Sequence, residues 1–198
     1  MTGYQIYLLL HVVGAIAWVG AQLVMTLFAG RAAVATAPGR MLELIGDAEW
    51  LGLRVFLPSN LLVLASGVLL VHEGPWSYGS LWIRLGLAGF SLSFLTGALF
   101  FGPQWGWLAK LVEAEGIGSP AAGRRLWGLL LATGIDLGVL LAVVTAMTVK
   151  PASADRATLV VVALLPAAGA VIGVVLARLA TSRAELAATA VGVPQPPV

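Results

Sequence analysis

The sequence predicts an all-α protein, an integral membrane bundle of five transmembrane helices. Hydrophobic residues make up 60% of its 198 residues, charged residues only 10%, and the mean hydropathy is +0.98. A soluble domain carries about 25% charged residues. Five apolar stretches are each long enough to cross a hydrocarbon core of about 30 Å as a helix. They lack the period-two alternation of a membrane β-barrel, so helices are favoured.

The expected spans are, in chain order, 4–29, 52–73, 81–102, 127–149 and 157–180. The first has a longer apolar run than a signal peptide and no Lys or Arg before it. We therefore expect it to be retained, although Ala33 to Ala37 holds two Ala-x-Ala patterns typical of cleavage sites. Pro58 and Pro166 should kink the second and fifth spans.

The segments outside the spans are short. Residues 38–51 and 103–116 mix apolar and charged side chains, which is typical of short interfacial helices. We expect a single transmembrane domain over 1–185 and a flexible tail over 186–198, whose final residues are rich in proline. Tryptophans near the span ends indicate an aromatic belt at the membrane surfaces: Trp50, Trp76, Trp82, Trp105, Trp107 and Trp127.

The placement of lysine and arginine predicts the orientation of the bundle. With the N-terminus outside, eight cationic residues fall on the inner side: Arg31, Arg40, Arg54, Lys110, Arg124, Arg125, Arg178 and Arg183. The outer side receives only Arg84, Lys150 and Arg156. This bias predicts an N-out, C-in topology. Like charges form no run, so nucleic acid is not an expected partner; the lipid bilayer is, and a homo-oligomer or membrane-complex partner stays open.

One face of the first span carries polar and polarisable side chains. At about 100° per residue, His11, Trp18, Gln22 and Met25 fall within roughly 60° of one another. A lipid-facing stripe would be apolar, because burying such groups in hydrocarbon costs free energy unless other parts of the protein meet them. We therefore expect this stripe to face the interior of the bundle.

Counting from the span ends sorts the polar residues into two layers. The outer layer contains His11, His72, Arg84, Met147 and Lys150, and the middle layer contains Gln22, Asn60, Ser93 and Asp136. A central Asp costs about 2.5–3.5 kcal/mol on insertion scales, so Asp136 should find a partner. Arg84 is the expected counter-ion if the third and fourth spans adjoin. The middle layer would then either fix helix packing or act as a proton or ion relay.

The outer layer resembles a ligand set for haem. A neutral imidazole binds haem iron, copper or zinc, and haem needs one or two axial ligands, an apolar slot and cations for its propionates. His11 is the candidate axial and metal ligand, with His72 or Met147 as a second and Arg84 or Lys150 near the propionates. Copper is a less favoured ligand, and a histidine that is merely hydrogen-bonded to a neighbouring helix stays open.

Several other activities lack the residues they need. The chain has no cysteine, which excludes disulfides and thiolate ligands, and only two histidines. It contains no nucleotide-binding glycine motif and no zinc-protease motif. We assign no catalytic residue.

The order of several short motifs resembles known membrane families. The pattern His11-x6-Trp18-x-Gly20, followed by Trp82-Ile-Arg84-Leu85, resembles CopD-type copper-resistance proteins and HemJ-type protoporphyrinogen oxidases of bacteria. An uncharacterised family of predicted integral membrane proteins is more similar still. Its members share a stretch like Ser66-Gly-Val-Leu-Leu and an Asp-Leu-x-x-Leu-Leu run ending in Met-x-x-Lys-Pro, here Asp136 to Pro151. The resemblance covers residues 5 to 151.

This resemblance implies a helical bundle in a bacterial cytoplasmic (inner) membrane, with a first-span histidine and haem or copper as cofactor. It singles out His11, Trp18, Gly20, Trp82, Arg84, Asp136 and Lys150. HemJ-like proteins favour Lys at the position of Arg84, and the change alters donor geometry and removes a titratable amine, so oxidase activity is not carried over. We expect a non-enzymatic binding or accessory protein with a haem or metal site at the outer leaflet. The alternatives are a haem-dependent membrane oxidoreductase and a small transporter with a relay through Asp136.

Overall fold

The computed structural model describes residues 1–35 and 37–190, with side chains to residue 182, and this part of the chain contains helices but no strand. The helices are α1 (Gly3–Ala33), α2 (Pro38–Leu51), α3 (Leu57–Glu73), α4 (Leu81–Thr96), α5 (Gly102–Glu115), α6 (Pro120–Val149) and α7 (Arg156–Ala190). Two π-helical segments, η1 (Gly52–Phe56) and η2 (Gly97–Phe101), join α2 to α3 and α4 to α5. Most of the tail expected over 186–198 lies outside the described residues.

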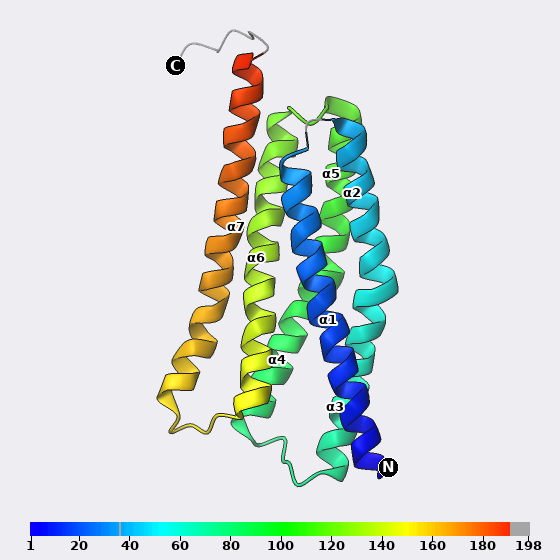
Figure 1. The fold of residues 1–198 in the computed structure, drawn as a ribbon, viewed down its shortest axis with the longest axis vertical. Helices are drawn as coiled ribbons and strands as arrows, with labels where there is room; N and C mark the ends of the chain where they lie inside the picture. The colour runs from blue at the N-terminus through cyan, green and yellow to red at the C-terminus, as the bar shows by residue number, and fades with distance from the viewer. Residues whose placement is uncertain (36, 191–198) are drawn as a thin grey trace.

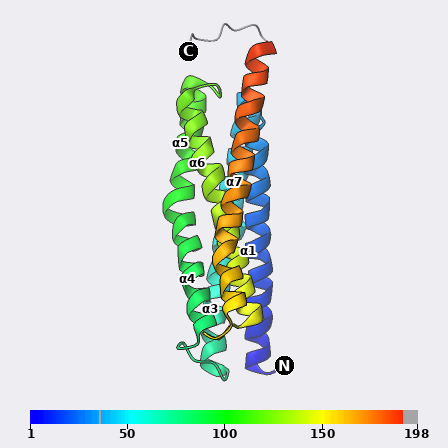
Figure 2. The same cartoon turned by 90° about the vertical axis from the view of Figure 1, so that its left-hand side faces the viewer.

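Five helical stretches in the described residues are long and apolar enough to cross a membrane: Gly3–Ala33, Pro38–Glu73, Leu81–Glu115, Pro120–Val149 and Arg156–Ser182. They run up and down in an elongated bundle (Figures 1 and 2). The expected all-α membrane bundle of five helices is confirmed.

The second and third spans are longer than expected. Residues 38–51 and 103–116 do not form separate interfacial helices, because α2 and α5 continue the axes of α3 and α4 (Figure 1). The reason lies in their apolar faces. Met41 and Leu44 of α2 and Leu108 of α5 are buried together with residues of α1, α6 and α7 in one cluster.

Each π-helical segment precedes a proline. Pro58 follows η1 and Pro103 follows η2, and the wider π turn relieves the clash between a proline ring and the preceding turn. In η1 the loosened carbonyls are used by side chains: Ser59 Oγ donates to the Val55 oxygen at 2.7 Å, and Asn60 Nδ2 to the Phe56 oxygen at 2.7 Å. Pro166, by contrast, lies inside α7, which continues past it.

The central helix α6 meets α7 through glycines. Gly134 and Gly138 face Gly169 and Gly173, so that the backbones touch; a Cβ at Gly173 would lie 2.7 Å from the Leu130 oxygen. The spacing of these glycines is the small-residue pattern of close membrane-helix contacts.

Two further helix pairs build the rest of the bundle. The helix α1 packs on α3, and α4 packs on α6. At the end of the bundle that holds the N-terminus, the α1–α3 pair stands apart from the α4–α6 pair (Figure 1). This separation is where the candidate site lies.

The glycine contact between α6 and α7 can be tested with matched alanine substitutions. Gly138→Ala would place a methyl group 2.7 Å from the Pro166 Cα, so the helices must move apart. We expect a loss of about 1–3 kcal/mol of stability, as for overpacked cores, seen as a lower Tm in detergent. Gly128→Ala on the same helix meets open space and should leave the Tm unchanged or slightly raised. Equal effects of the two substitutions would contradict this account of the contact.

Candidate functional site

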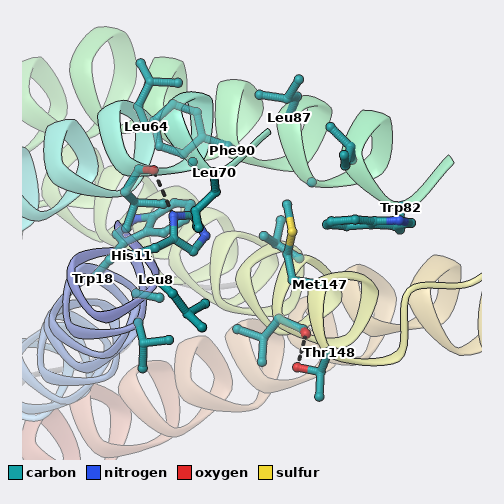
Figure 3. Close-up of a pocket in the computed structure, with 18 of the residues that line it drawn as sticks. Leu8, His11, Trp18, Leu64, Leu70, Trp82, Leu87, Phe90, Met147 and Thr148 are labelled. Carbon is teal, nitrogen blue, oxygen red and sulfur yellow. Dashed lines mark hydrogen bonds between the residues drawn. The ribbon is translucent and has the colours of Figure 1, made fainter. Parts of the chain in front are cut away.

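A cavity of about 690 Å³ lies between α1, α3, α4 and α6 at the N-terminal end of the bundle. Its walls are mostly aliphatic and aromatic side chains such as Leu8, Leu64, Leu87 and Phe90 (Figure 3). This volume falls within the range of about 300–1,000 Å³ typical of small-molecule and cofactor pockets. The few polar groups that reach the cavity therefore decide what it can hold.

His11 is the imidazole of this cavity, and its orientation is fixed by α3. Its Nδ1 lies 3.0 Å from the backbone oxygen of Val63 and 3.2 Å from Ser66 Oγ. A carbonyl oxygen only accepts, so Nδ1 carries the proton and donates it to Val63. The other nitrogen, Nε2, then has a free lone pair. The hydrogen bonds of the described residues include none to Nε2, and Figure 3 shows this edge of the ring turned toward Met147.

Three glycines on different helices give the site its room. A Cβ at Gly67 would lie 3.1 Å from His11 Cε1, so this glycine admits the imidazole against α3. The methyl end of Met147 occupies the space where a Gly86 side chain would be. Gly20 also lines the cavity, and no atom lies within 4 Å of the position of its missing Cβ.

One cation, Lys150, also lines the cavity. Lys150 ends α6 in the left-handed region, with φ 55°, and its Nζ lies 4.1 Å from the ring centroid of Trp76 and 5.3 Å from that of Trp82. The two indoles meet edge to face at 5.2 Å. Such cation–π contacts hold an ammonium group in place. Trp76 and Trp82 thus line the cavity and hold the side chain of Lys150.

Six residues were predicted to bind the cofactor, the five of the outer layer and Trp18 from the family resemblance; of these, His11, Trp18, Met147 and Lys150 line the cavity. His72 and Arg84 are exposed and are not among the lining residues. At 100° per residue, Arg84 points about 160° away from Gly86, and His72 about 140° away from Gly67. Counting residues from a span end carries no information on the side of the helix that these side chains occupy.

An apolar floor closes the cavity on the inner side. Trp18, Val63, Phe90 and Leu140, one from each helix, pack against one another. Trp18 contacts the ring of Phe90 edge to face at 5.3 Å. Sequence reasoning missed Phe90, because a phenylalanine in an apolar span carries no signal that distinguishes a floor residue from a lipid-facing one.

The predicted middle layer lies one helical turn below this floor. Gln22 and Ser93 follow their floor residues by four and three positions, and Asn60 and Asp136 precede theirs by three and four, as expected for antiparallel helices; all four are buried. Gln22 Nε2 donates to the Thr133 oxygen at 3.4 Å, linking α1 to α6.

The expected Arg84–Asp136 pair is not formed. Arg40 and Glu43 make the one ion pair among the described residues. Arg84 lies nine residues before Ser93, which is about 13 Å along the helix axis, and its side chain is exposed. The prediction of Arg84 as the counter-ion of Asp136 is therefore wrong.

The described residues contain no group of three or more His, Asp or Glu side chains able to hold a metal ion. The protein-derived ligands at the cavity are thus one imidazole and, across from it, one thioether (Figure 3).

Comparisons with known proteins identify a family. A family model described as "Predicted integral membrane protein (DUF2269)" matches residues 5–151. The matched range is the one over which the sequence resembled such a family. Searches of curated proteins and of solved structures found no match.

Proposed function

The chain belongs to the DUF2269 family of predicted integral membrane proteins, and we propose that it is a haem-binding or accessory protein with His11 as axial ligand at the outer leaflet. One observation carries the proposal. The Nδ1–H of His11 is donated to the Val63 oxygen at 3.0 Å, so that Nε2 offers its lone pair to an apolar cavity of about 690 Å³. Histidines that bind metals typically donate their second ring nitrogen to a carbonyl or carboxylate in this way.

The donor set favours haem over a bare metal ion. Zinc and copper sites take three or four protein ligands, and the described residues offer no such group. Haem brings four nitrogens of its own and needs one or two axial ligands from the protein. A single oriented imidazole in an apolar slot meets that need.

The other lining residues have distinct expected roles. Met147 presents a thioether to the cavity and is the candidate for a second axial ligand, since Gly86 leaves it the room. Lys150, whose ammonium group lies over the Trp76 ring, would pair with a propionate. Trp18 forms the floor. When bound, haem would supply a redox-active iron. His11 and Lys150 would hold it, and the apolar walls would exclude water.

The alternative of a haem-dependent oxidoreductase uses the same ligand. It requires, in addition, a reducible or oxidisable substrate that reaches the cavity. The transport alternative uses the middle layer, which is a separate site below the floor.

The haem proposal predicts a spectrum that depends on one histidine. Protein expressed with ample haem and purified in mild detergent should show a Soret absorption band. His11→Ala should remove the band, because the axial nitrogen is lost. Adding imidazole to His11→Ala should restore it by filling the vacated space.

The second histidine provides the matched control. His72→Ala removes an exposed imidazole outside the cavity and should leave the band unchanged. Wild-type protein without a Soret band after expression with ample haem would contradict the proposal. So would an unchanged band in His11→Ala.

We also propose that the bundle lies in a bacterial cytoplasmic membrane with its N-terminal end outside. Helical stretches of up to 36 residues are about 54 Å long and exceed a hydrocarbon core of about 30 Å. The charged helices α2 and α5 would then extend into the cytoplasm, with Arg54 at the inner boundary. The excess of cations at this end supports the orientation.

The orientation predicts which introduced thiols are accessible. The chain has no cysteine, so Ser77→Cys in the α3–α4 loop and Gly118→Cys in the α5–α6 loop each provide a single thiol. Both positions are exposed. An impermeant maleimide added to intact cells should label Ser77→Cys, whereas Gly118→Cys should react only after permeabilisation. The opposite pattern would reverse the topology.

A further inference from the structure

We propose that Asn60, Ser93 and Asp136 form a binding site for a dehydrated monovalent cation, Na⁺ being the probe, in the layer below the cavity floor. The site goes beyond haem binding and does not depend on it. Each residue comes from a different helix: Asn60 from α3, Ser93 from α4 and Asp136 from α6.

The first observation that supports an ion site is a set of three buried side-chain oxygens. Asn60 and Ser93 are 0% exposed and Asp136 is 4% exposed. Asn60 Oδ1, Ser93 Oγ and Asp136 Oδ2 are buried, and no hydrogen bond of ordinary geometry reaches them, although Ser93 lies beside the Asp136 carboxyl. Polar atoms removed from water without a partner cost several kcal/mol in an apolar medium, so three together indicate a missing ligand.

The packing of the floor brings these oxygens to one level. Val63, Phe90 and Leu140 belong with Trp18 to one packed cluster, and Asn60, Ser93 and Asp136 lie three or four residues from them on the same helices. Residues three or four positions apart share a helix face, so all three side chains face the bundle axis. The Ser93 side chain faces the carboxyl of Asp136 directly.

The backbone of η1 sets the direction of the Asn60 amide. Its Nδ2 donates to the Phe56 oxygen at 2.7 Å, and a carbonyl oxygen can face only the amide nitrogen. Oδ1 is therefore the atom presented to the interior. The layer offers an amide oxygen, a hydroxyl oxygen and a carboxylate, which are the ligands of hard cations.

The charge of the layer selects a monovalent ion. Asp136 is its single carboxylate, and the one ion pair among the described residues is elsewhere, between Arg40 and Glu43. A buried carboxylate needs an opposite charge close by. One positive charge neutralises this carboxylate, whereas a divalent ion would leave the layer with one excess positive charge. Trp18 Nε1, also buried without a partner, lies in the floor above and supplies no charge.

Na⁺-dependent stability tests the site without reference to haem. The Tm of the purified protein in detergent is measured while NaCl replaces choline chloride at constant ionic strength. A ligand that binds only the folded state stabilises it in proportion to the logarithm of its concentration above Kd. We expect a rise of roughly 5 °C between 1 and 100 mM Na⁺.

Three variants test whether the Na⁺ dependence of the Tm arises from this layer. Asp136→Asn should fold and lose the dependence on Na⁺, and Ser93→Ala should shift it to higher Na⁺ concentration. Asp47→Asn, which removes an exposed carboxylate on α2, should respond like the wild type.

Two results would overturn the proposal. If the wild-type Tm is the same in NaCl and choline chloride, Asp136 is neutralised by a proton and the layer serves packing alone. If Asp136→Asn keeps the full Na⁺ response, the ion binds elsewhere. Neither result bears on the Soret band of the His11 site.

Discussion

The inability of a membrane interior to solvate polar groups is the constraint on which this structure depends. The first helix carries His11, Trp18 and Gln22 on one face, and each must be met by another helix or by a ligand. His11 is met by the Val63 carbonyl of α3, and Gln22 by the Thr133 carbonyl of α6. The stripe thus determines which helices surround α1. The same constraint makes the remaining unpartnered atoms, above all those around Asp136, informative about function.

The floor of Trp18, Val63, Phe90 and Leu140 divides the bundle into two compartments. Above it lies an apolar cavity with one imidazole and one ammonium group. Below it lies a small oxygen-lined layer with one carboxylate. The two are about one helical turn apart, and the apolar floor separates the proposed haem site from the proposed Na⁺ site. Ligands in the two compartments would interact electrostatically across a medium of low dielectric, where charges act strongly on one another.

The fold was predictable from sequence, since composition and span length determine it. Gln22, Asn60 and Asp136, which residue counting assigned to a middle layer, are buried in the bundle. The side of the helix was not predictable for His72 and Arg84, because the helix neighbours were unknown. The donation of Nδ1 to Val63 left no signal in the sequence, since every residue has a carbonyl. The merging of 38–51 and 103–116 into long helices depended on packing partners that are distant in the chain.

The central claim is that α3 fixes the tautomer of His11 and leaves Nε2 free to bind a ligand. Nitrogen-15 NMR of histidine-labelled, haem-free protein measures this directly, and a His72→Ala background leaves His11 as the single histidine. Two-bond proton–nitrogen correlations should show a neutral ring with its proton on Nδ1 and an unprotonated Nε2. A proton on Nε2, or a doubly protonated ring at neutral pH, would contradict the account.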